Sequence, residues 1–353
     1  MSTTRHFAAL DGLRGVAALA VLLLHVVDPF HLSYLPLHAP LAVDFFFALS
    51  GFVIAHAYED RLRAGMPFLQ FARIRMIRLY PLVVVGMLFG LAVLGARALG
   101  QRDVDFIARS GGALVAGLFM MPSPFLLGPG NMSAYPLNTP MWSLFVELAI
   151  NAAYALTIRH LGTRMLTLAI VVGGAMMIWL SLTPGALADA ENWSTLYRGF
   201  GKVLFSFAAG VALSRLWRSG KLSWVRIPAP VLFIVLTAIL LTPKPPWPDF
   251  YNLVAIVLVF PVLVAAGANA ELQGSARKLA LFAGELSYPV YILHYPFVRA
   301  FSGIARLLDL QGPPLYAFLL LEGVVILVAC YIVMKLIDRP VRRMLGRPAA
   351  RAA

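Results

Sequence analysis

The feature that most constrains this chain is a series of apolar stretches, each about 20 residues long, that recur over almost its whole length. Stretches of this length cross the hydrocarbon core of a bilayer as helices. They are continuous rather than alternating, which disfavours a transmembrane β-barrel. Only 13% of the 353 residues are charged, about half the share found in soluble domains. The sequence therefore predicts a polytopic, all-α integral membrane protein.

Ten of these stretches are predicted to be transmembrane helices. An additional stretch, 106–127, is weaker, because it contains three glycines and ends in Pro122 and Pro124. We expect it to form a re-entrant or interfacial segment, and we expect residues 1–353 to form a single transmembrane domain with no appended soluble domain. The ten predicted spans are 11–30, 41–58, 77–97, 140–158, 165–183, 196–216, 228–242, 250–268, 281–301 and 315–336.

The formal net charge of +13 reflects an excess of Lys and Arg over Asp and Glu. With ten spans and a cytoplasmic N-terminus, 21 of the 29 Lys and Arg residues fall on the cytoplasmic side. This bias follows the positive-inside rule and predicts that both termini are cytoplasmic. The basic balance thus indicates a lipid bilayer rather than nucleic acid as the partner. The single cysteine, Cys330, excludes an intrachain disulfide, and no ligand spacing indicates a metal site.

Polar residues in the first predicted span share one helix face. Arg14 and His25 are eleven residues apart, which is almost three turns and about 16 Å along the axis. Asp28 is three residues further on and can neighbour His25. Charged groups at bilayer depth are costly and indicate function or interior pairing. The structural alternatives are a topology anchor for Arg14, a hydrogen-bonded core histidine for His25 and a helix end for Asp28.

A second polar stripe lies in the fourth predicted span and includes Glu147, about 10 Å deep in the bilayer. His25 approaches the same depth, so that the carboxylate is expected to orient the imidazole and stabilise its charged form. The alternative is an ion pair between Glu147 and Lys202, and Glu322 is another candidate partner for Lys202. The stripe consists of Ser143, Glu147, Asn151 and Tyr154.

Three further segments carry candidate site residues. In the ninth span, Tyr288 is followed by Pro289, which is expected to kink the helix; the alternative is simple packing around that kink. Asp44 is expected at the outer surface, at the start of the second span. Arg73 and Arg75 lie in a cytoplasmic segment that also contains Arg78, and arginine forks suit phosphate. Side chains expected to share one face of the ninth span are Ser287, Tyr291 and His294.

Together these segments resemble the membrane-bound acyltransferase 3 family, the bacterial O-acyltransferases of cell-surface glycans. Six pieces match in order from one end of the chain to the other. They are LDGLRG at 10–15 with His25 (Arg-x10-His), FFFALSGFVI at 45–54, Arg73 with Arg75 (Arg-x-Arg), Trp142-Ser143-Leu144 with Glu147 (WSL-x-x-E), LSYPVYILH at 286–294, and the variant acidic-x-Pro motif at 338–340. Leu148 departs from the family, since many members have a second Glu there.

The resemblance implies a protein of the bacterial inner membrane that uses acyl-CoA, most simply acetyl-CoA, as donor and a carbohydrate or glycoconjugate hydroxyl as acceptor. Arg14, Arg73 and Arg75 would hold the CoA phosphates. His25 would act as general base or carry the acyl group, assisted by Glu147 or Asp28. The residues expected to contact substrate are Trp142, Ser143, Asp44, Tyr288, Tyr291, His294 and Lys202.

Two other functions fit the same polar residues. The first is a transporter in which His25, Glu147 and Lys202 relay protons. The second is a subunit that exports acyl groups for a separate transferase. The arginines on the cytoplasmic side favour acyl transfer over the relay, because a proton relay does not require groups that bind phosphate.

Overall fold

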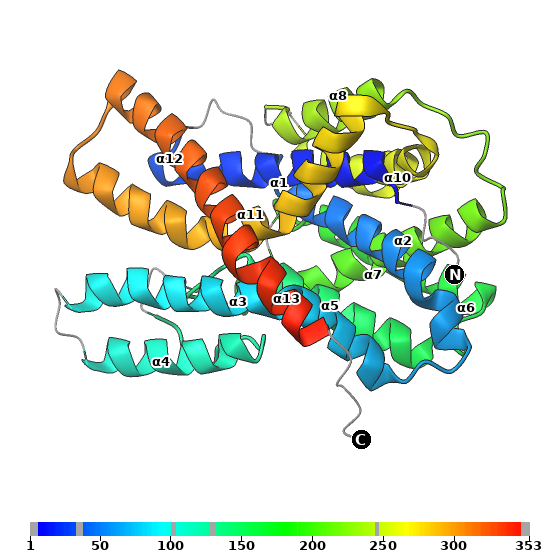
Figure 1. Cartoon of the computed structure of the whole chain (residues 1–353), viewed down its shortest axis with the longest axis horizontal. Helices are drawn as coiled ribbons and strands as arrows, with labels where there is room; N and C mark the ends of the chain where they lie inside the picture. The colour runs from blue at the N-terminus through cyan, green and yellow to red at the C-terminus, as the bar shows by residue number, and fades with distance from the viewer. Residues whose placement is uncertain are drawn as a thin grey trace.

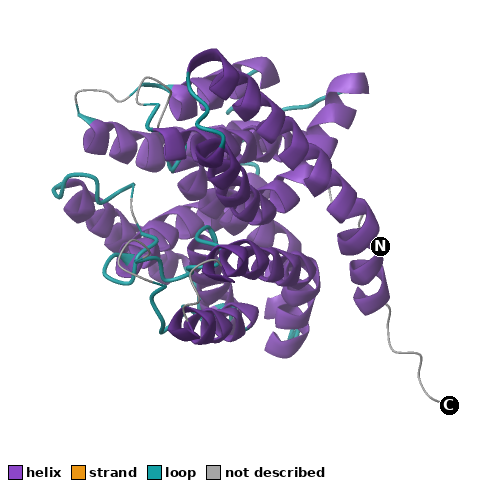
Figure 2. Ribbon diagram, turned by 90° about the vertical axis from the view of Figure 1, so that its left-hand side faces the viewer, coloured by secondary structure: helices purple, strands orange, loops and turns teal. Residues whose placement is uncertain are grey.

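The computed structural model describes residues 6–32, 38–99, 104–127, 132–188, 190–243 and 247–346, so Arg5, Arg347 and Arg351 of the predicted cytoplasmic segments lie outside it. All elements named within these ranges are helices (Figures 1 and 2). The α-helices are α1 (Ala8–Val27), α2 (Leu41–Arg63), α3 (Phe68–Leu99), α4 (Val104–Leu118), α5 (Met141–Thr157), α6 (Thr163–Ser181), α7 (Leu196–Arg218), α8 (Ala229–Leu241), α9 (Pro248–Val254), α10 (Phe260–Asn269), α11 (Gly274–Leu307), α12 (Gly312–Val333) and α13 (Arg339–Gly346).

The predicted spans are occupied by helix. Among the described residues, seven helical segments are long and apolar enough to cross a bilayer, while α5 and α8 are apolar but shorter. The 34 residues of α11 are sufficient in length, but polar side chains along this helix lower its hydropathy. The chain is therefore a polytopic helical membrane protein, and the number of ten spans stays a prediction.

Helix α4 covers part of the weak stretch 106–127. It lies alongside α3 in Figure 1. Its 15 residues reach only about 22 Å, less than the roughly 30 Å of a hydrocarbon core. This length is compatible with the re-entrant or interfacial segment expected from the sequence.

Segment 133–140, which precedes α5, is buried along its whole length. The backbone N–H of Ala134 donates to the carbonyl of Glu191 at 2.9 Å, so this segment is tied to the loop between α6 and α7. Asn138 donates through Nδ2 to the carbonyl of Ile292 at 2.8 Å. That carbonyl lacks its helical partner because Pro296 has no N–H. The buried loop thus donates a hydrogen bond to a carbonyl that Pro296 leaves free in α11.

Helices α2 and α7 make one of the most extensive contacts of the bundle. Gly51 lies against the backbone of Phe207, and Gly210 lies against the carbonyl of Ala48. A Cβ atom at either glycine would collide with backbone atoms of the other helix, which cannot swing aside as a side chain can. Small residues therefore set the close approach of these helices.

Gly51→Ala is expected to destabilise the protein by at least about 1–3 kcal/mol, because the added methyl group forces two helix backbones apart. Thermal unfolding in detergent should show a midpoint several degrees lower than that of the wild type. The matched control is Gly323→Ala in α12, where an added Cβ would have no neighbouring atom within 4 Å and no loss is expected. Equal midpoints for the Gly51 variant and the wild type would contradict the packing argument.

Glu59 connects the end of α2 to two other helices, α5 and α7. Its carboxylate, 4% exposed, accepts hydrogen bonds from Arg63 and Arg215 at 3.0 Å and from the hydroxyl of Tyr154 at 3.2 Å. Both arginines also donate to the carbonyl of Leu161 at 2.9 Å. This network fixes α2, α5 and α7 relative to one another near one end of the bundle.

Candidate active site

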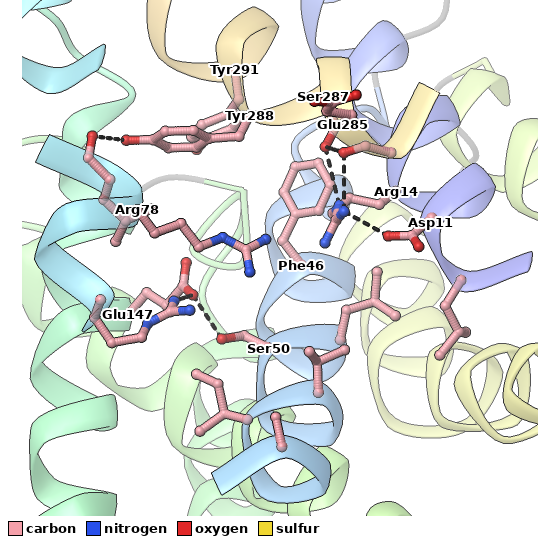
Figure 3. Close-up of a pocket in the computed structure, with 18 of the residues that line it drawn as sticks. Asp11, Arg14, Phe46, Ser50, Arg78, Glu147, Glu285, Ser287, Tyr288 and Tyr291 are labelled. Carbon is pink, nitrogen blue, oxygen red and sulfur yellow. Dashed lines mark hydrogen bonds and ion pairs between the residues drawn. The ribbon is translucent and has the colours of Figure 1, made fainter. Parts of the chain in front are cut away.

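A cavity of about 770 Å³, here called the basic pocket, lies between α1, α2, α3, α5, α11 and α13. Figure 3 shows its central residues. Three carboxylates and five arginines line it, which leaves an excess of positive charge inside the bundle. The five arginines are Arg14, Arg61, Arg75, Arg78 and Arg342.

Arg14 is held in place by α1 and α11 together. Its guanidinium donates to Asp11 at 2.7 Å, to the carbonyl of Gly284 at 3.0 Å and to the hydroxyl of Ser287 at 3.1 Å (Figure 3). The absence of a side chain at Gly284 lets α11 approach Asp11 closely, since a Cβ there would meet that residue. Arg14 therefore borders the cavity with its guanidinium held by three hydrogen bonds.

Glu147 faces the basic pocket from α5. One carboxylate oxygen accepts from Ser50 at 2.7 Å and from Arg75 at 3.1 Å. The sequence allowed two other partners, His25 and Lys202, and neither expectation is met. Spacing along one helix gives the depth of a residue but not the direction in which neighbouring helices turn their own polar faces.

The arginines of α3 divide between two faces. Arg75 and Arg78 are one turn apart and both line the basic pocket. Arg78 points its guanidinium toward the middle of the pocket (Figure 3) and is close enough to Arg14, Arg75 and Arg342 for mutual repulsion. Arg73 lies outside the pocket and donates to the carbonyl of Leu345 at 3.4 Å. The predicted pair of Arg73 and Arg75 is therefore replaced in the cavity by Arg75 and Arg78.

A second cavity of about 380 Å³, here called the histidine pocket, contains His25. Asp28 lines the same cavity, as the sequence suggests, but the His25 ring has no hydrogen bond among the described residues. The ring instead packs against His294 and Tyr295, with centroid distances of 5.1 and 5.4 Å. The side chains with polar atoms that line the histidine pocket are those of His25, Asp28, Trp142, Glu191, Asn192 and Tyr291.

The two pockets share two lining residues, Val43 of α2 and Tyr291 of α11. The Tyr291 hydroxyl lies 2.5 Å from the Ser143 hydroxyl, and Ser143 donates to the carbonyl of Pro140 at 3.0 Å. The ring of Phe46 packs edge-on against Tyr291. A wall only one side chain thick therefore separates the arginines from His25.

Asp44 and Lys202 form a buried ion pair. Their charged atoms are 3.1 Å apart, and the two side chains are 0% and 1% exposed. Lys202 also donates to the carbonyl of Leu187 at 2.6 Å. Neither residue lines the two pockets. Asp44 lies at the start of α2, as expected, but its side chain is buried within the protein.

The remaining predicted residues are distributed over both pockets. Trp142 lines the histidine pocket, whereas Ser143 and Tyr288 line the basic pocket. Tyr288 donates to the carbonyl of Leu79 at 2.6 Å. His294 is fully buried behind His25 and bonds through Nδ1 to the carbonyl of Val290 at 2.9 Å.

The structure adds site residues that the sequence did not single out. Glu191 and Asn192 enter the histidine pocket from the loop before α7, where no helical periodicity reveals their direction. Arg342 reaches the basic pocket from the last helix. Of the unassigned residues, only Arg78 could have been found from the sequence, because it follows Arg75 at the spacing that places two side chains on the same helix face.

The polar residues of the alternative proton relay are not assembled. His25 lies in the histidine pocket, Glu147 bonds to Arg75 across the wall, and Lys202 is paired with Asp44. The arrangement instead provides an anion-binding cavity beside a cavity that contains an imidazole without a hydrogen-bonding partner among the described residues.

The chain is similar in sequence to several known proteins. Acyltransferase MdmB of Streptomyces mycarofaciens is 26% identical, with 96% of this chain and 92% of that protein covered. The exopolysaccharide production protein ExoZ of Rhizobium meliloti is 24% identical over 88% of this chain and 94% of that protein. Protein 2 in the picA locus of Rhizobium radiobacter is 41% identical over 44% of this chain and 83% of that protein. No solved structure matches the chain.

The model of the acyltransferase 3 family, described as an acyltransferase domain, matches residues 7–334. This segment contains both pockets except for His6 and Arg342. The chain therefore belongs to the acyltransferase 3 family and is an acyltransferase enzyme.

Proposed function

We propose that this membrane acyltransferase moves an acetyl group from cytoplasmic acetyl-CoA to a hydroxyl of an extracytoplasmic carbohydrate or glycoconjugate. In this proposal the basic pocket opens to the cytoplasm of a bacterial inner membrane and binds the donor. The histidine pocket opens to the other side and binds the acceptor. The observation that carries the proposal is the junction at Val43 and Tyr291, where the two pockets meet.

The composition of the basic pocket supports a CoA thioester as donor. The excess of arginine over carboxylate inside a low-dielectric bundle favours a polyanion, and guanidinium forks bind phosphate through paired hydrogen bonds. Arg78 has no hydrogen-bond partner among the described residues, so its donors are available to a ligand. The volume of the pocket also falls within the range of ordinary cofactor and substrate sites.

The histidine pocket supports a carbohydrate acceptor. Asp28, Glu191 and Asn192 supply oxygen atoms that accept hydrogen bonds from sugar hydroxyls, and Trp142 supplies an aromatic face. The name of ExoZ refers to exopolysaccharide production, which fits an acceptor of this class.

Acyl transfer in this arrangement needs one proton acceptor at the junction. The thioester carbonyl carbon would lie near Tyr291, with the acyl group directed toward His25. The imidazole removes the proton from the acceptor hydroxyl as its oxygen attacks that carbon. The carbon–sulfur bond then breaks, the CoA thiolate leaves on the side of the basic pocket, and it takes up the proton that the imidazole removed, so that the imidazole becomes neutral again. The products are an ester and free CoA.

The test of this function is a reaction in proteoliposomes that contain only the purified protein. Labelled acetyl-CoA is supplied on one side, and surface glycan from cells that lack the gene is supplied on the other. The proposal expects labelled ester on the glycan and release of one CoA per ester. Mass analysis of glycans from cells with and without the gene then identifies the acceptor.

Two results of the proteoliposome experiment would favour a different function. Transfer only after addition of a second protein would favour the exporter function. Flux of a solute without consumption of acetyl-CoA would favour a transporter and overturn the proposal.

A further inference from the structure

The two pockets meet beside a single polar side chain, that of Tyr291. Among the described residues, Val43 and Tyr291 are the two that line both cavities, and of this pair Tyr291 carries the hydrogen-bond donor. The inference rests on the proposed function, in which the donor lies in the basic pocket and the acceptor in the histidine pocket. The new ester bond then forms where the pockets meet, so the thioester carbonyl lies beside the Tyr291 hydroxyl.

Tyr291 is fixed at this position by its ring and by its hydroxyl. The ring packs edge-on against Phe46 at a centroid distance of 5.5 Å, and the hydroxyl lies 2.5 Å from that of Ser143. Ser143 lines the basic pocket and donates at 3.0 Å to the carbonyl of Pro140, a residue that lines the histidine pocket. A chain of hydrogen-bonding groups therefore crosses the wall, and Tyr291 is the member of this chain that lines both cavities.

The contact between Tyr291 and Ser143 can form with either hydroxyl as the donor. In one arrangement Ser143 donates to Pro140 and accepts the proton of Tyr291. In the other, the Ser143 hydroxyl rotates and donates to Tyr291, so that the phenolic proton is free to turn toward a ligand. A hydroxyl that accepts one hydrogen bond becomes a stronger donor in the next. The pair is therefore suited to an oxygen atom on which negative charge develops.

We infer that Tyr291 is a catalytic residue whose hydroxyl stabilises the tetrahedral intermediate of acyl transfer. As the acceptor oxygen adds to the thioester carbon, the π-electron pair of the carbonyl moves onto its oxygen. Tyr291 donates a hydrogen bond to this oxyanion and keeps its own proton, whereas His25, which lines the same pocket, takes the proton of the acceptor hydroxyl. The electron pair returns to the carbonyl when the carbon–sulfur bond breaks, and the hydrogen bond weakens again.

The first test is Tyr291→Phe, which removes the hydroxyl and retains the ring. The turnover number for ester formation in proteoliposomes is expected to fall about 100- to 1,000-fold, the usual effect of losing one donor to an oxyanion. The affinity for acetyl-CoA, measured by calorimetry in detergent, should stay at the wild-type value, because the arginines of the basic pocket are unchanged. Ser143→Ala should lower turnover less, since it leaves the phenol in place and removes only its hydrogen-bonding neighbour.

The second test observes the hydrogen bond itself. Acetyl-CoA labelled with ¹³C at the thioester carbonyl is bound to the protein without acceptor, and infrared difference spectra record the carbonyl stretching band. A hydrogen bond to the carbonyl oxygen lowers this frequency. The band is therefore expected at a lower frequency in the wild type than in Tyr291→Phe, a difference that a purely structural role of the ring would not produce.

The matched control is Tyr251→Phe. The hydroxyl of Tyr251 donates to the carbonyl of Ile239 at 3.1 Å, and the residue lines neither pocket. This variant should keep the turnover number and the carbonyl frequency of the wild type.

Three results would overturn the inference: ester formation by Tyr291→Phe at the wild-type rate, the same carbonyl frequency in that variant and the wild type, or a loss of acetyl-CoA affinity as large as the loss of turnover. A wild type that forms no ester from acetyl-CoA would overturn the proposed function itself.

Discussion

Replacement of His25 by alanine is expected to lower the rate of acyl transfer by about 100- to 10,000-fold, the usual contribution of a general base. The imidazole lines the histidine pocket together with Trp142, and among the described residues no other histidine lines it. Because the arginines lie beyond the wall at Tyr291, the same variant should bind acetyl-CoA as tightly as the wild type does. The measurements are initial rates of ester formation and, separately, binding of acetyl-CoA.

The control for this variant is His160→Ala, which removes an exposed histidine in the turn between α5 and α6. It should leave both rate and binding unchanged, and both variants should unfold at the temperature of the wild type. Normal ester formation by the His25 variant would remove the imidazole from the reaction. A parallel loss of acetyl-CoA binding would instead indicate a structural role for the ring.

Replacement of Lys202 by methionine is expected to destabilise the protein by about 3–5 kcal/mol, because it leaves the Asp44 carboxylate buried without its counter-charge. Asp44 is completely inaccessible, so water cannot replace the ammonium group without opening the bundle. The change should appear as a large drop in the midpoint of thermal unfolding and in the yield of folded protein from detergent.

The double variant Asp44→Asn, Lys202→Met distinguishes the effect of an unpaired buried charge from the effect of altered packing. Removal of both charges should recover most of the lost stability, as observed when buried ion pairs are replaced together. If each residue instead held the substrate, the single variants would unfold like the wild type and lose activity only. A double variant less stable than Lys202→Met would contradict the account of the ion pair.

The sequence predicted the fold well because the bilayer imposes a simple rule. Each apolar stretch must satisfy its backbone internally and therefore forms a helix. This rule locates α1, α2, α3 and α7 from hydropathy alone. It does not reveal the buried segment 133–140, whose position depends on Asn138 and on a carbonyl freed by a proline in another helix.

The sequence predicted many of the residues that line the two pockets, but not which of these residues would contact one another. Helical spacing correctly placed Arg14 and His25 at different depths of one helix, and they line different pockets. The partners of Glu147 and Lys202 were not predictable, because pairing depends on how α2, α3, α5 and α7 rotate against one another. Those rotations follow from contacts such as that of Gly51 with Phe207, which periodicity does not encode.

The walls of the basic pocket extend from His6 near one end of the chain to Arg342 near the other. A ribosome inserts these parts into the membrane at opposite ends of synthesis. A growing polypeptide therefore cannot enclose the cavity until nearly all of its helices have been translated. A chain that stops before α13 would therefore leave the cavity open on the side that Arg342 lines.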